Sequence, residues 1–236
     1  MTRKTSSGFT LIEMLVVISI IAIIAAFAVP TLTQALSKGQ MTGTMNNVRQ
    51  LYLAGQQMAL DGATNSDSNY AWPGDYTGSS AITTLADYCG KLVSNGYLNP
   101  GDLQKLLNAP GATCTVTSST DASGVATVTL SGRSGLKVYK VKEVDSSNVL
   151  FAVTANYTYN SALTPTGAPY GDKGFVVMHK GGDAGILRKN QSTAANYGAG
   201  QAGINKFQST VGKMSGDADG TLQNSDQQTA LTNPSG

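Results

Sequence analysis

The sequence predicts an α+β fold in which one long helix, at the beginning of the chain, packs by its outer half against an antiparallel β-sheet. Between residues 31 and 60, apolar residues recur at intervals of three and four, which is the period of an amphipathic helix. Between residues 113 and 189, short β-branched and aromatic segments alternate with turn sequences. Helical pattern followed by strand pattern, without regular alternation of the two, is typical of α+β domains.

The helix begins in an apolar segment that is long enough to cross a membrane. The segment from Phe9 to Val29 carries one charged residue, Glu13. About 20 apolar residues in a helix span the hydrocarbon core of a bilayer. Arg3 and Lys4 precede it without an acid, so the positive-inside rule places the short leader in the cytoplasm and the rest of the chain outside.

Glu13 is the residue of the apolar segment that calls for a partner. A carboxylate inside hydrocarbon costs about 2.5 to 3.5 kcal/mol on insertion scales. Cleavage between Gly8 and Phe9 would create an α-amino group four residues before Glu13, on the same helix face. That amine, or the amine of a neighbouring chain, would neutralise the carboxylate. Alternatively, Glu13 lies at the membrane edge and points toward the headgroups.

The residues from Gly8 to Glu13 (GFTLIE), followed by the apolar run and Pro30, resemble the amino terminus of type IV pilins and of the pseudopilins of type II secretion. The resemblance covers about the first 50 residues and implies a type IV pilin-like fold. It implies that a prepilin peptidase cuts after Gly8 and methylates the amine of Phe9. It also implies that Glu13 pairs with the amine of a neighbouring subunit during assembly.

The function that this resemblance implies is structural. We expect a pilin that enters the bacterial inner membrane, with its amino terminus in the cytoplasm, and then polymerises with copies of itself into an extracellular filament. The other expected partners are the prepilin peptidase and methyltransferase and the inner-membrane assembly machinery. The alternative is a pseudopilin of a type II secretion or DNA-uptake system, and less expected is a membrane-tethered binding module. No enzyme is expected, because no active-site motif accompanies the fold pattern.

Composition argues against nucleic acid as a partner. The 236-residue chain has a formal net charge of +2, and loss of Arg3 and Lys4 with the leader would leave 14 basic and 14 acidic side chains. Such a balance gives no basic field for a polyanion. The length leaves room for one soluble domain of moderate core size after the helix.

The chain divides into six predicted segments. They are a cytoplasmic leader that is removed (1–8), the membrane and filament-core helix (9–30), its amphipathic continuation (31–60), a loop-rich connection with short helices (61–112), the antiparallel sheet (113–189) and a polar tail (190–236). The expected short helices are 82–88, 91–95 and 102–108, and the expected strands are 113–117, 125–131, 136–144, 149–157, 175–179 and 185–188. The tail is either mobile or wraps the sheet edge or a neighbouring subunit.

Two further features shape the predicted helix and its connection. Pro30 removes an internal hydrogen bond, so we expect a kink or local unwinding there, or a mere membrane boundary. Asp61 and Gly62 are expected to end the helix. In the loop that follows, Trp72 and Tyr76 are expected to anchor the chain against the domain.

Cys89 and Cys114 are expected to form a disulfide, because they lie on the side of the membrane where disulfides persist. Closing a loop of this length would stabilise the fold by about 3 kcal/mol in the chain-entropy model. The alternatives are two free buried thiols or, with less support, a metal or thiol-catalytic site. The one histidine, His179, is distant in sequence and is expected to form a hydrogen bond in its turn.

The tail contains three acids, Asp217, Asp219 and Asp226, whose spacing resembles half of a calcium loop. Calcium takes six to eight oxygen ligands, and the later bidentate Glu of such loops is absent. Solvated turn acids are therefore the stronger interpretation, and calcium is the expected cofactor if there is one. The resemblance keeps calcium open, because major pseudopilins carry a calcium site near the carboxyl terminus.

Overall fold

The computed structural model describes residues 8–121 and 126–234 of the chain. It contains two compact units, one ending at Gly39 and one beginning at Gln40. We call the second unit the folded domain. Most of the predicted leader, residues 1–7, and Val125, where a strand was expected to begin, lie outside the described residues.

The helix α1 (Leu11–Asn65) is longer than the sequence predicts. It continues through Gly62, because the absent side chain lets the carbonyl oxygen of Tyr70 lie directly against the helix. The helix ends instead at Ser66, which adopts a left-handed φ of 55°. The backbone N–H of Asp67 then donates to the carbonyl of Gly62 at 3.0 Å, which satisfies one of the last helical carbonyls.

The folded domain adds short helices and strands to the second half of α1. In chain order the helices are α2 (Leu85–Ser94), α3 (Pro100–Leu107), α4 (Gly200–Thr210) and α5 (Asp226–Thr229). The strands are β1 (Cys114–Thr120), β2 (Ala126–Gly132), β3 (Leu136–Val138), β4 (Leu150–Thr154), β5 (Phe175–His179) and β6 (Ala184–Leu187). Single 3₁₀ turns occur at Gly78–Ser80, Lys189–Gln191 and Ala194–Tyr197.

The strands form two antiparallel sheets rather than the single sheet that the sequence predicts. One has the order β1-β2, and the other has the order β3-β4-β5-β6. Gly132 ends β2 with a positive φ of 86°, and the buried hydroxyl of Ser134 then bonds both the N–H and the carbonyl of Leu136. These constraints separate β2 from β3, so the ladder does not continue across the connection.

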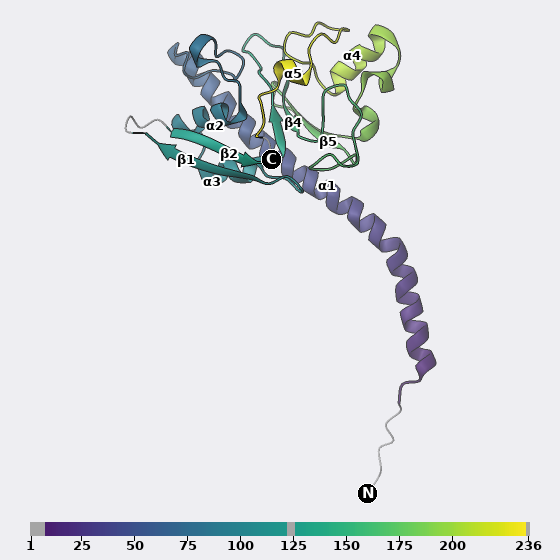
Figure 1. Cartoon of the computed structure of the whole chain (residues 1–236). Coiled ribbons are helices and arrows are strands. Elements are labelled where there is room, and N and C mark those ends of the chain that lie inside the picture. The colour runs from purple at the N-terminus through teal and green to yellow at the C-terminus, as the bar shows by residue number, and fades with distance from the viewer. Residues whose placement is uncertain (1–7, 122–125, 235–236) are drawn as a thin grey trace. The chain divides into compact units, whose positions relative to one another are not determined.

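The first hairpin packs on the two short helices. Figure 1 shows β1 and β2 beside α2 and α3, in agreement with the contacts of α2 with β2 and of α3 with β1. Thr84 and Asp87 cap α2 reciprocally, which fixes where it starts. The sequence predicts two helices here, yet α2 passes through Gly90. A Cβ on Gly90 would lie 3.8 Å from the carbonyl oxygen of Ala126, which is an ordinary contact distance, so this buried position of α2 faces the hairpin without requiring a glycine.

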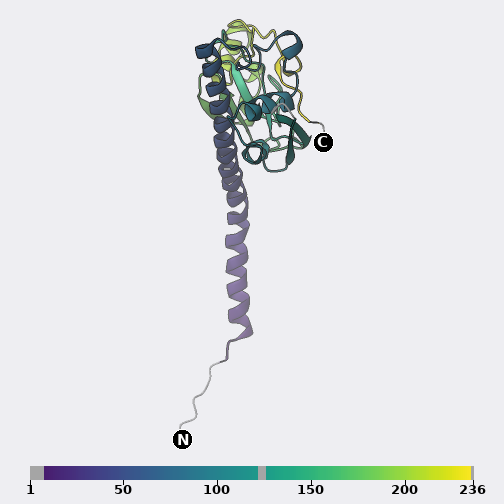
Figure 2. The same ribbon diagram turned by 90° about the vertical axis from the view of Figure 1, so that its left-hand side faces the viewer.

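The second half of α1 lies along one side of the folded domain (Figure 2). Val48, Leu51, Tyr52 and Met58 enter the larger hydrophobic cluster. Phe151 on β4 is central to it, because three aromatic rings surround it at centroid distances of 5.5 to 6.4 Å. These rings belong to Tyr52, Trp72 and Tyr88. Trp72 and Tyr76 are both buried, as the sequence predicts.

The tail covers the opposite face of the four-stranded sheet. β4 and β5 are buried at every residue, so both faces of the sheet need a cover. Phe207, Val211 and Met214, from α4 and the residues after it, pack in a second cluster with Val153 and Phe175. The tail is therefore part of the fold.

The segment after α5 pairs with the edge of β3. The N–H of Leu231 donates to the carbonyl of Val138 at 2.8 Å, and Tyr139 forms a bridge with Ala230. The sequence leaves open whether the tail is mobile, wraps the sheet edge or contacts a neighbouring subunit. In the structure the tail wraps the sheet edge.

A glycine-to-alanine pair in α1 tests this packing. An alanine methyl group at Gly55 would overlap the Tyr88 hydroxyl and contact Phe151, whereas a Cβ at Gly43 would meet no atom within 4 Å. We expect Gly55→Ala to lower the free energy of unfolding by about 1–3 kcal/mol. Gly43→Ala should raise it by about 0.5–1 kcal/mol through helix propensity. Denaturant unfolding of the full chain in detergent measures both, and equal effects would contradict the packing.

Candidate assembly site

The first unit of the chain exposes an extended apolar surface. All residues from Gly8 to Leu36 are exposed. The large apolar side chains on it are Phe9, Leu11, Ile12, Met14, Leu15, Val16, Val17, Ile18, Ile20, Ile21, Ile23, Ile24, Phe27, Val29, Leu32 and Leu36. Apolar patches of this extent mark membrane or protein interaction surfaces.

The length and hydropathy of α1 agree with a membrane span. Over the described residues, α1 is the one helix long and apolar enough to cross a bilayer, with a mean hydropathy of 2.8 in its most apolar window. No residue of that window is buried inside the protein. The segment is therefore an interaction surface and not the core helix of a soluble domain.

The start of α1 is closed by a reciprocal cap between Thr10 and Glu13. The backbone N–H of Glu13 donates to Oγ1 of Thr10 at 3.3 Å. In return, Oε2 of Glu13 accepts from the N–H of Thr10 at 2.8 Å and from its hydroxyl at 2.6 Å. This is the geometry of a capping box, with Thr10 at the N-cap and Glu13 at N3. Glu13 therefore has an intramolecular partner at the helix start.

The capping role of Thr10 was not among the expectations from the sequence. The Thr-x-x-Glu pattern indicates it, because this pattern places a capping hydroxyl three residues before an acid at the start of an apolar helix. Glu13 also lies in the first turn of α1, where the helix dipole favours a negative charge. Capping explains part of why an acid stands in this apolar segment.

The predicted cleavage point precedes this cap. Gly8 and Phe9 are exposed and lie outside any helix or strand, two residues before α1 begins at Leu11. A protease needs an accessible peptide that is not held in a helix or strand, and this segment meets both conditions. Cleavage after Gly8 stays a prediction.

Pro30 lies inside α1 without interrupting it. The local unwinding that the sequence suggests does not occur, because the helix continues on both sides. Neighbouring hydroxyls bond the carbonyls around it: Thr31 donates to Ala28 at 2.8 Å, and Thr33 donates to Pro30 at 2.9 Å. Such back-bonding accompanies bends in helices. A kink at Pro30 stays a prediction.

Cys89 and Cys114 are free, buried thiols in the structure, which differs from the expected disulfide. Both belong to the larger hydrophobic cluster, Cys89 from α2 and Cys114 from the start of β1. Burial, and the nearby Cys114, raise the pKa of the Cys89 thiol well above its usual range. The reduced thiols are thus protonated and unreactive. A bond between them stays a prediction for the oxidised protein.

Two of the three tail acids form hydrogen bonds or ion pairs with other groups of the protein. Oδ1 of Asp217 accepts from the N–H groups of Gln223 and Asn224 at 2.8 and 2.9 Å, which closes the loop before α5. Asp219 pairs with the ammonium group of Lys213 at 2.8 Å. These contacts agree with turn acids.

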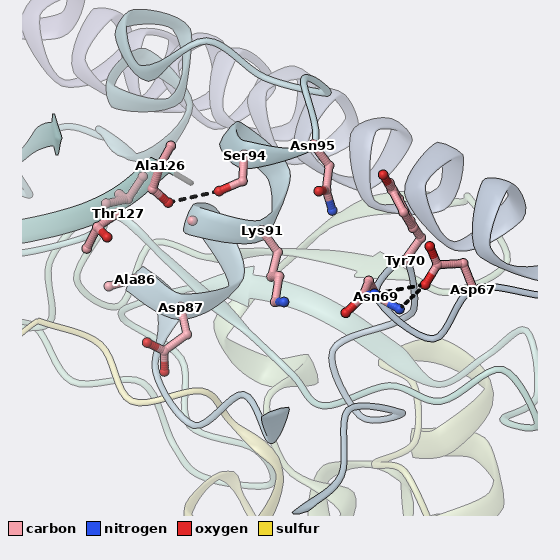
Figure 3. A pocket seen from close by; sticks show the side chains of 12 residues that line it. Asp67, Asn69, Tyr70, Ala86, Asp87, Lys91, Ser94, Asn95, Ala126 and Thr127 are labelled. Atoms are coloured by element: carbon pink, nitrogen blue, oxygen red, sulfur yellow. Dashed lines mark hydrogen bonds between the residues drawn. The ribbon is translucent and has the colours of Figure 1, made fainter. Parts of the chain in front are cut away.

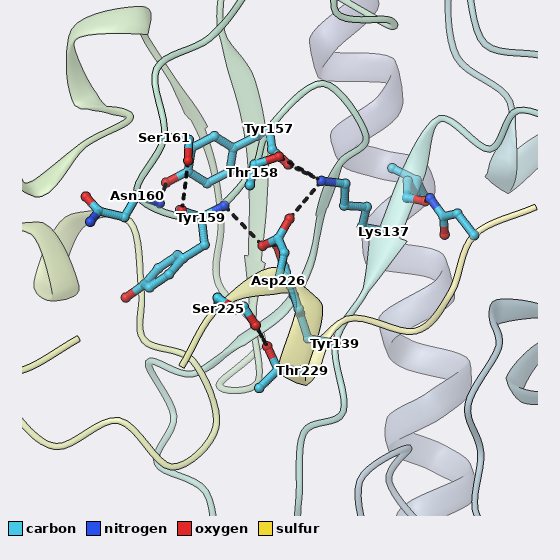
Figure 4. A network of polar contacts seen from close by, with 12 residues as sticks. Lys137, Tyr139, Tyr157, Thr158, Tyr159, Asn160, Ser161, Ser225, Asp226 and Thr229 are labelled. Atoms are coloured by element: carbon cyan, nitrogen blue, oxygen red, sulfur yellow. Dashed lines mark hydrogen bonds and ion pairs between the residues drawn. The ribbon is translucent and has the colours of Figure 1, made fainter. Parts of the chain in front are cut away.

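Asp226 belongs to a separate, partly buried network (Figure 4). Its carboxylate accepts from the Lys137 ammonium and the Tyr139 hydroxyl, both at 2.8 Å, and from the N–H of Tyr159 at 3.0 Å. Burial, together with Asp226, raises the pKa of the Tyr139 hydroxyl well above its usual range, so this hydroxyl remains a donor. The network fastens α5 to the sheet.

The structure does not bring the three acids together as ligands. Within residues 8–121 and 126–234, no group of three or more His, Cys, Asp or Glu side chains is placed to hold a metal. His179 forms the predicted turn bond, with Nδ1 2.6 Å from the carboxylate of Asp183. Calcium binding therefore stays a prediction without a supporting cluster.

A cavity of about 470 Å³ lies between α2, the loop after α1 and the start of β2 (Figure 3). Several of its polar groups have local partners: Ser94 donates to the carbonyl of Ala126, and Asp67 accepts from Asn69. The Lys91 ammonium lies 5.5 Å from the centre of the Tyr76 ring. Ser94 is thus bonded to a carbonyl and not to a base.

Replacing Asp226 tests its structural role against a role in calcium binding. Asp226→Asn leaves the Lys137 ammonium partly buried beside two remaining acceptors, the carbonyl of Tyr157 and the hydroxyl of Thr158. We expect a loss of about 2 kcal/mol in the free energy of unfolding, with or without calcium. Asp102→Asn, in an exposed pair, should cost at most about 0.5 kcal/mol. A calcium-dependent melting temperature that disappears in Asp226→Asn would contradict this assignment.

The state of the cysteines is tested by alkylation. We expect filament-derived protein, unfolded without reductant, to take up no alkylating reagent at Cys89 and Cys114, and to take up two equivalents after reduction. Mass spectrometry measures both numbers. Two equivalents without reductant would instead establish the free buried thiols of the structure.

Comparisons with known proteins place the chain among fimbrial subunits. Residues 3–29 match the family model of the prokaryotic N-terminal methylation motif. The type IV major fimbrial protein FimA of Dichelobacter nodosus is 30% identical over 90 residues, which are 36% of this chain and 58% of the relative. No solved structure matches the chain significantly.

Two other relatives align over more of their length. Fimbrial protein EcpC of Eikenella corrodens is 30% identical over 126 residues, which are 53% of this chain and 70% of the relative. Fimbrial protein Q of Moraxella bovis is 29% identical over 144 residues, which are 55% of this chain and 88% of the relative. With the long helix, the antiparallel sheets and the motif at its start, the chain belongs to the type IV pilin family.

Proposed function

We propose that the chain is the structural subunit of an extracellular type IV pilus-like filament, into which it polymerises through the first half of α1. The observation that carries this proposal is the uncovered apolar surface from Phe9 to Leu36. Burying apolar surface contributes about 25 cal/mol per Å², so this helix is unstable in water and stable in a membrane or among other copies of itself. Its two environments are the bilayer before assembly and the filament core afterwards.

Processing prepares the helix for assembly. We propose that a prepilin peptidase cuts after Gly8 and that the new amine of Phe9 is methylated, as the match to the methylation motif at residues 3–29 supports. Removal of the leader also removes Arg3 and Lys4, which hold the amino terminus in the cytoplasm. The helix is then free to leave the membrane outward.

Glu13 serves both the helix and the assembly in this proposal. Both contacts with Thr10 are made by Oε2, so Oε1 accepts no hydrogen bond among the described residues. One oxygen caps the helix of its own subunit, and the other is available to the Phe9 amine of a neighbour. A charge-assisted bond of this kind is strong in an apolar surrounding.

A conservative substitution separates the two roles of Glu13. Glu13→Gln keeps an N3 side chain that completes a capping box but removes the charge. We expect normal membrane levels of processed subunit and at least a tenfold loss of sheared filaments, measured by quantitative immunoblotting of the sheared and membrane fractions.

Thr10→Val is the matched variant, because it removes both hydroxyl contacts of the cap and keeps the charge and the backbone N–H contact to Oε2. We expect it to reduce filaments by less than Glu13→Gln does. If Glu13→Gln assembles normally while Thr10→Val does not, capping is the role of this acid and intersubunit pairing is not. A wild-type chain that stays in the membrane fraction with no sheared filament would favour a pseudopilin.

A further inference from the structure

The second half of α1 has an exposed face that the folded domain does not cover. The helix packs on the domain through buried residues such as Val48, Leu51 and Met58. Between residues 46 and 60, the exposed residues recur at intervals of three and four, which places them together on one side of the helix. We call this side the outer face; its residues are Asn46, Arg49, Gln50, Leu53, Gln57 and Leu60.

The outer face carries two large apolar side chains. Leu53 and Leu60 are 54% and 58% exposed, although they belong to the folded domain. Among the described residues from Gln40 onward, the other exposed large apolar side chains are Val144 and Ile186. The two leucines are seven residues apart, which is about two helical turns, so both point to the same side. One exposed leucine is ordinary, but two in line on one helix form an apolar patch.

The outer face is also poor in charge, because Arg49 is its one charged side chain. The shorter helices of the same domain differ in this respect: α2 exposes Asp87, and α3 exposes Asp102 and Lys105. Solvated helix faces usually carry charged side chains, whereas the centres of protein interfaces are depleted in them. The outer face therefore resembles an interface more than a solvated surface.

The other half of the helix indicates what covers the outer face. The first half of α1 exposes large apolar side chains all the way round the helix. A helix of this kind is stable only in an apolar surrounding. In a filament of copies, any part of a folded domain that touches a first half has to carry few charges, because burying an unpaired charge is costly. The outer face meets this requirement, and it belongs to the same uninterrupted helix as the assembly surface.

We propose that the outer face is a second contact surface of the filament, against which the apolar first half of α1 from another copy of this chain packs. This role rests on the proposed pilin function and deepens it, because it assigns a partner to a surface of the folded domain. From Asn46 to Leu60 the outer face extends about 21 Å along the helix axis, at 1.5 Å per residue. Such a length meets several turns of a neighbouring helix.

The side chains of the outer face divide the work of this contact. Leu53 and Leu60 supply the apolar area that is removed from water. Arg49 covers its neighbour with the aliphatic part of its side chain while the guanidinium stays in water.

Photo-crosslinking within sheared filaments identifies the partner. p-Benzoylphenylalanine is placed at Leu53 or at Leu60, and in control variants at Val144 or at Ile186. We expect irradiation to give subunit dimers from positions 53 and 60, and mass spectrometry to map the crosslinked peptide to Phe9–Leu36. The control positions should give no crosslink to that segment. Crosslinks from 53 and 60 that reach only lipid, another protein or the folded domain, or no crosslinks at all, overturn the proposal.

Charged substitutions test whether the contact holds the filament together. We expect the double variant Leu53→Lys, Leu60→Lys to lower the amount of sheared filament at least tenfold, because two ammonium groups would be buried against an apolar helix. Val144→Lys, Ile186→Lys is the matched control and should assemble normally. Quantitative immunoblotting measures sheared filament and membrane-bound subunit. Equal amounts of filament from the two double variants contradict the contact.

Folding is measured separately, by denaturant unfolding of each double variant in detergent. Both leucines are exposed, so we expect the same unfolding midpoint as the wild type. If the midpoint falls, the crosslinks decide, because they are made in filaments of otherwise unchanged subunits.

The outcomes distinguish this proposal from the pilin function itself. A wild-type chain that yields no sheared filament would contradict the pilin function. Wild-type filaments that tolerate lysine at positions 53 and 60 would keep the pilin function and overturn the role of the outer face.

Discussion

The molecule depends on one constraint: the two halves of the continuous helix α1 both carry apolar side chains, and each half is buried by a different partner. From Gln40 onward, α1 supplies the side chains on which the folded domain packs, among them Leu51 and Met58. Before Gly39 its large apolar side chains are exposed in the part of the chain that the structure describes. The first surface is buried by folding and the second by a bilayer or by other subunits. Assembly therefore completes the burial that folding leaves unfinished.

The same reasoning accounts for the tail. The four-stranded sheet is apolar on both faces, and α1 covers one of them. The tail is rich in polar residues, yet three of its large apolar side chains, Phe207, Val211 and Met214, are buried on the other face. A segment of low mean hydropathy can therefore contain a few apolar side chains that anchor it. Here these anchors act together with the partly buried pair of Lys137 and Asp226.

The parts of the fold that follow from local pattern were predictable from the sequence. The strand Phe175–His179 has the predicted bounds, because its apolar run and glycine turns are local signals. Gly62 and Gly90 predict helix ends, yet both helices continue through them. At Gly62 the missing side chain lets the carbonyl oxygen of Tyr70 lie against the helix, and at Gly90 the buried face of α2 packs toward the hairpin. Such a contact joins distant segments and has no signature in a single window of sequence.

The strand boundaries failed for a similar reason. The apolar pattern from Leu136 to Val144 predicts one long strand, whereas β3 ends at Val138. Beyond that point Tyr139 still donates to Phe151 on β4, but it also forms a bridge with Ala230, and the N–H of Lys140 then donates to the carbonyl of Thr229 in α5. The partner lies about 90 residues away in the chain, so only the tertiary structure decides where the strand stops.

The candidate assembly site was predictable in its residues but not in its geometry. The sequence identifies Gly8, Phe9 and Glu13 by their spacing, and it gives Glu13 a charge in need of a partner. The structure adds that Thr10 already occupies one carboxylate oxygen. Oε2 of Glu13 is already held by its own helix, so the pairing that we propose between Oε1 and a neighbour's amine would order this side chain little further. In that proposal, capping preorganises the charge for the incoming subunit.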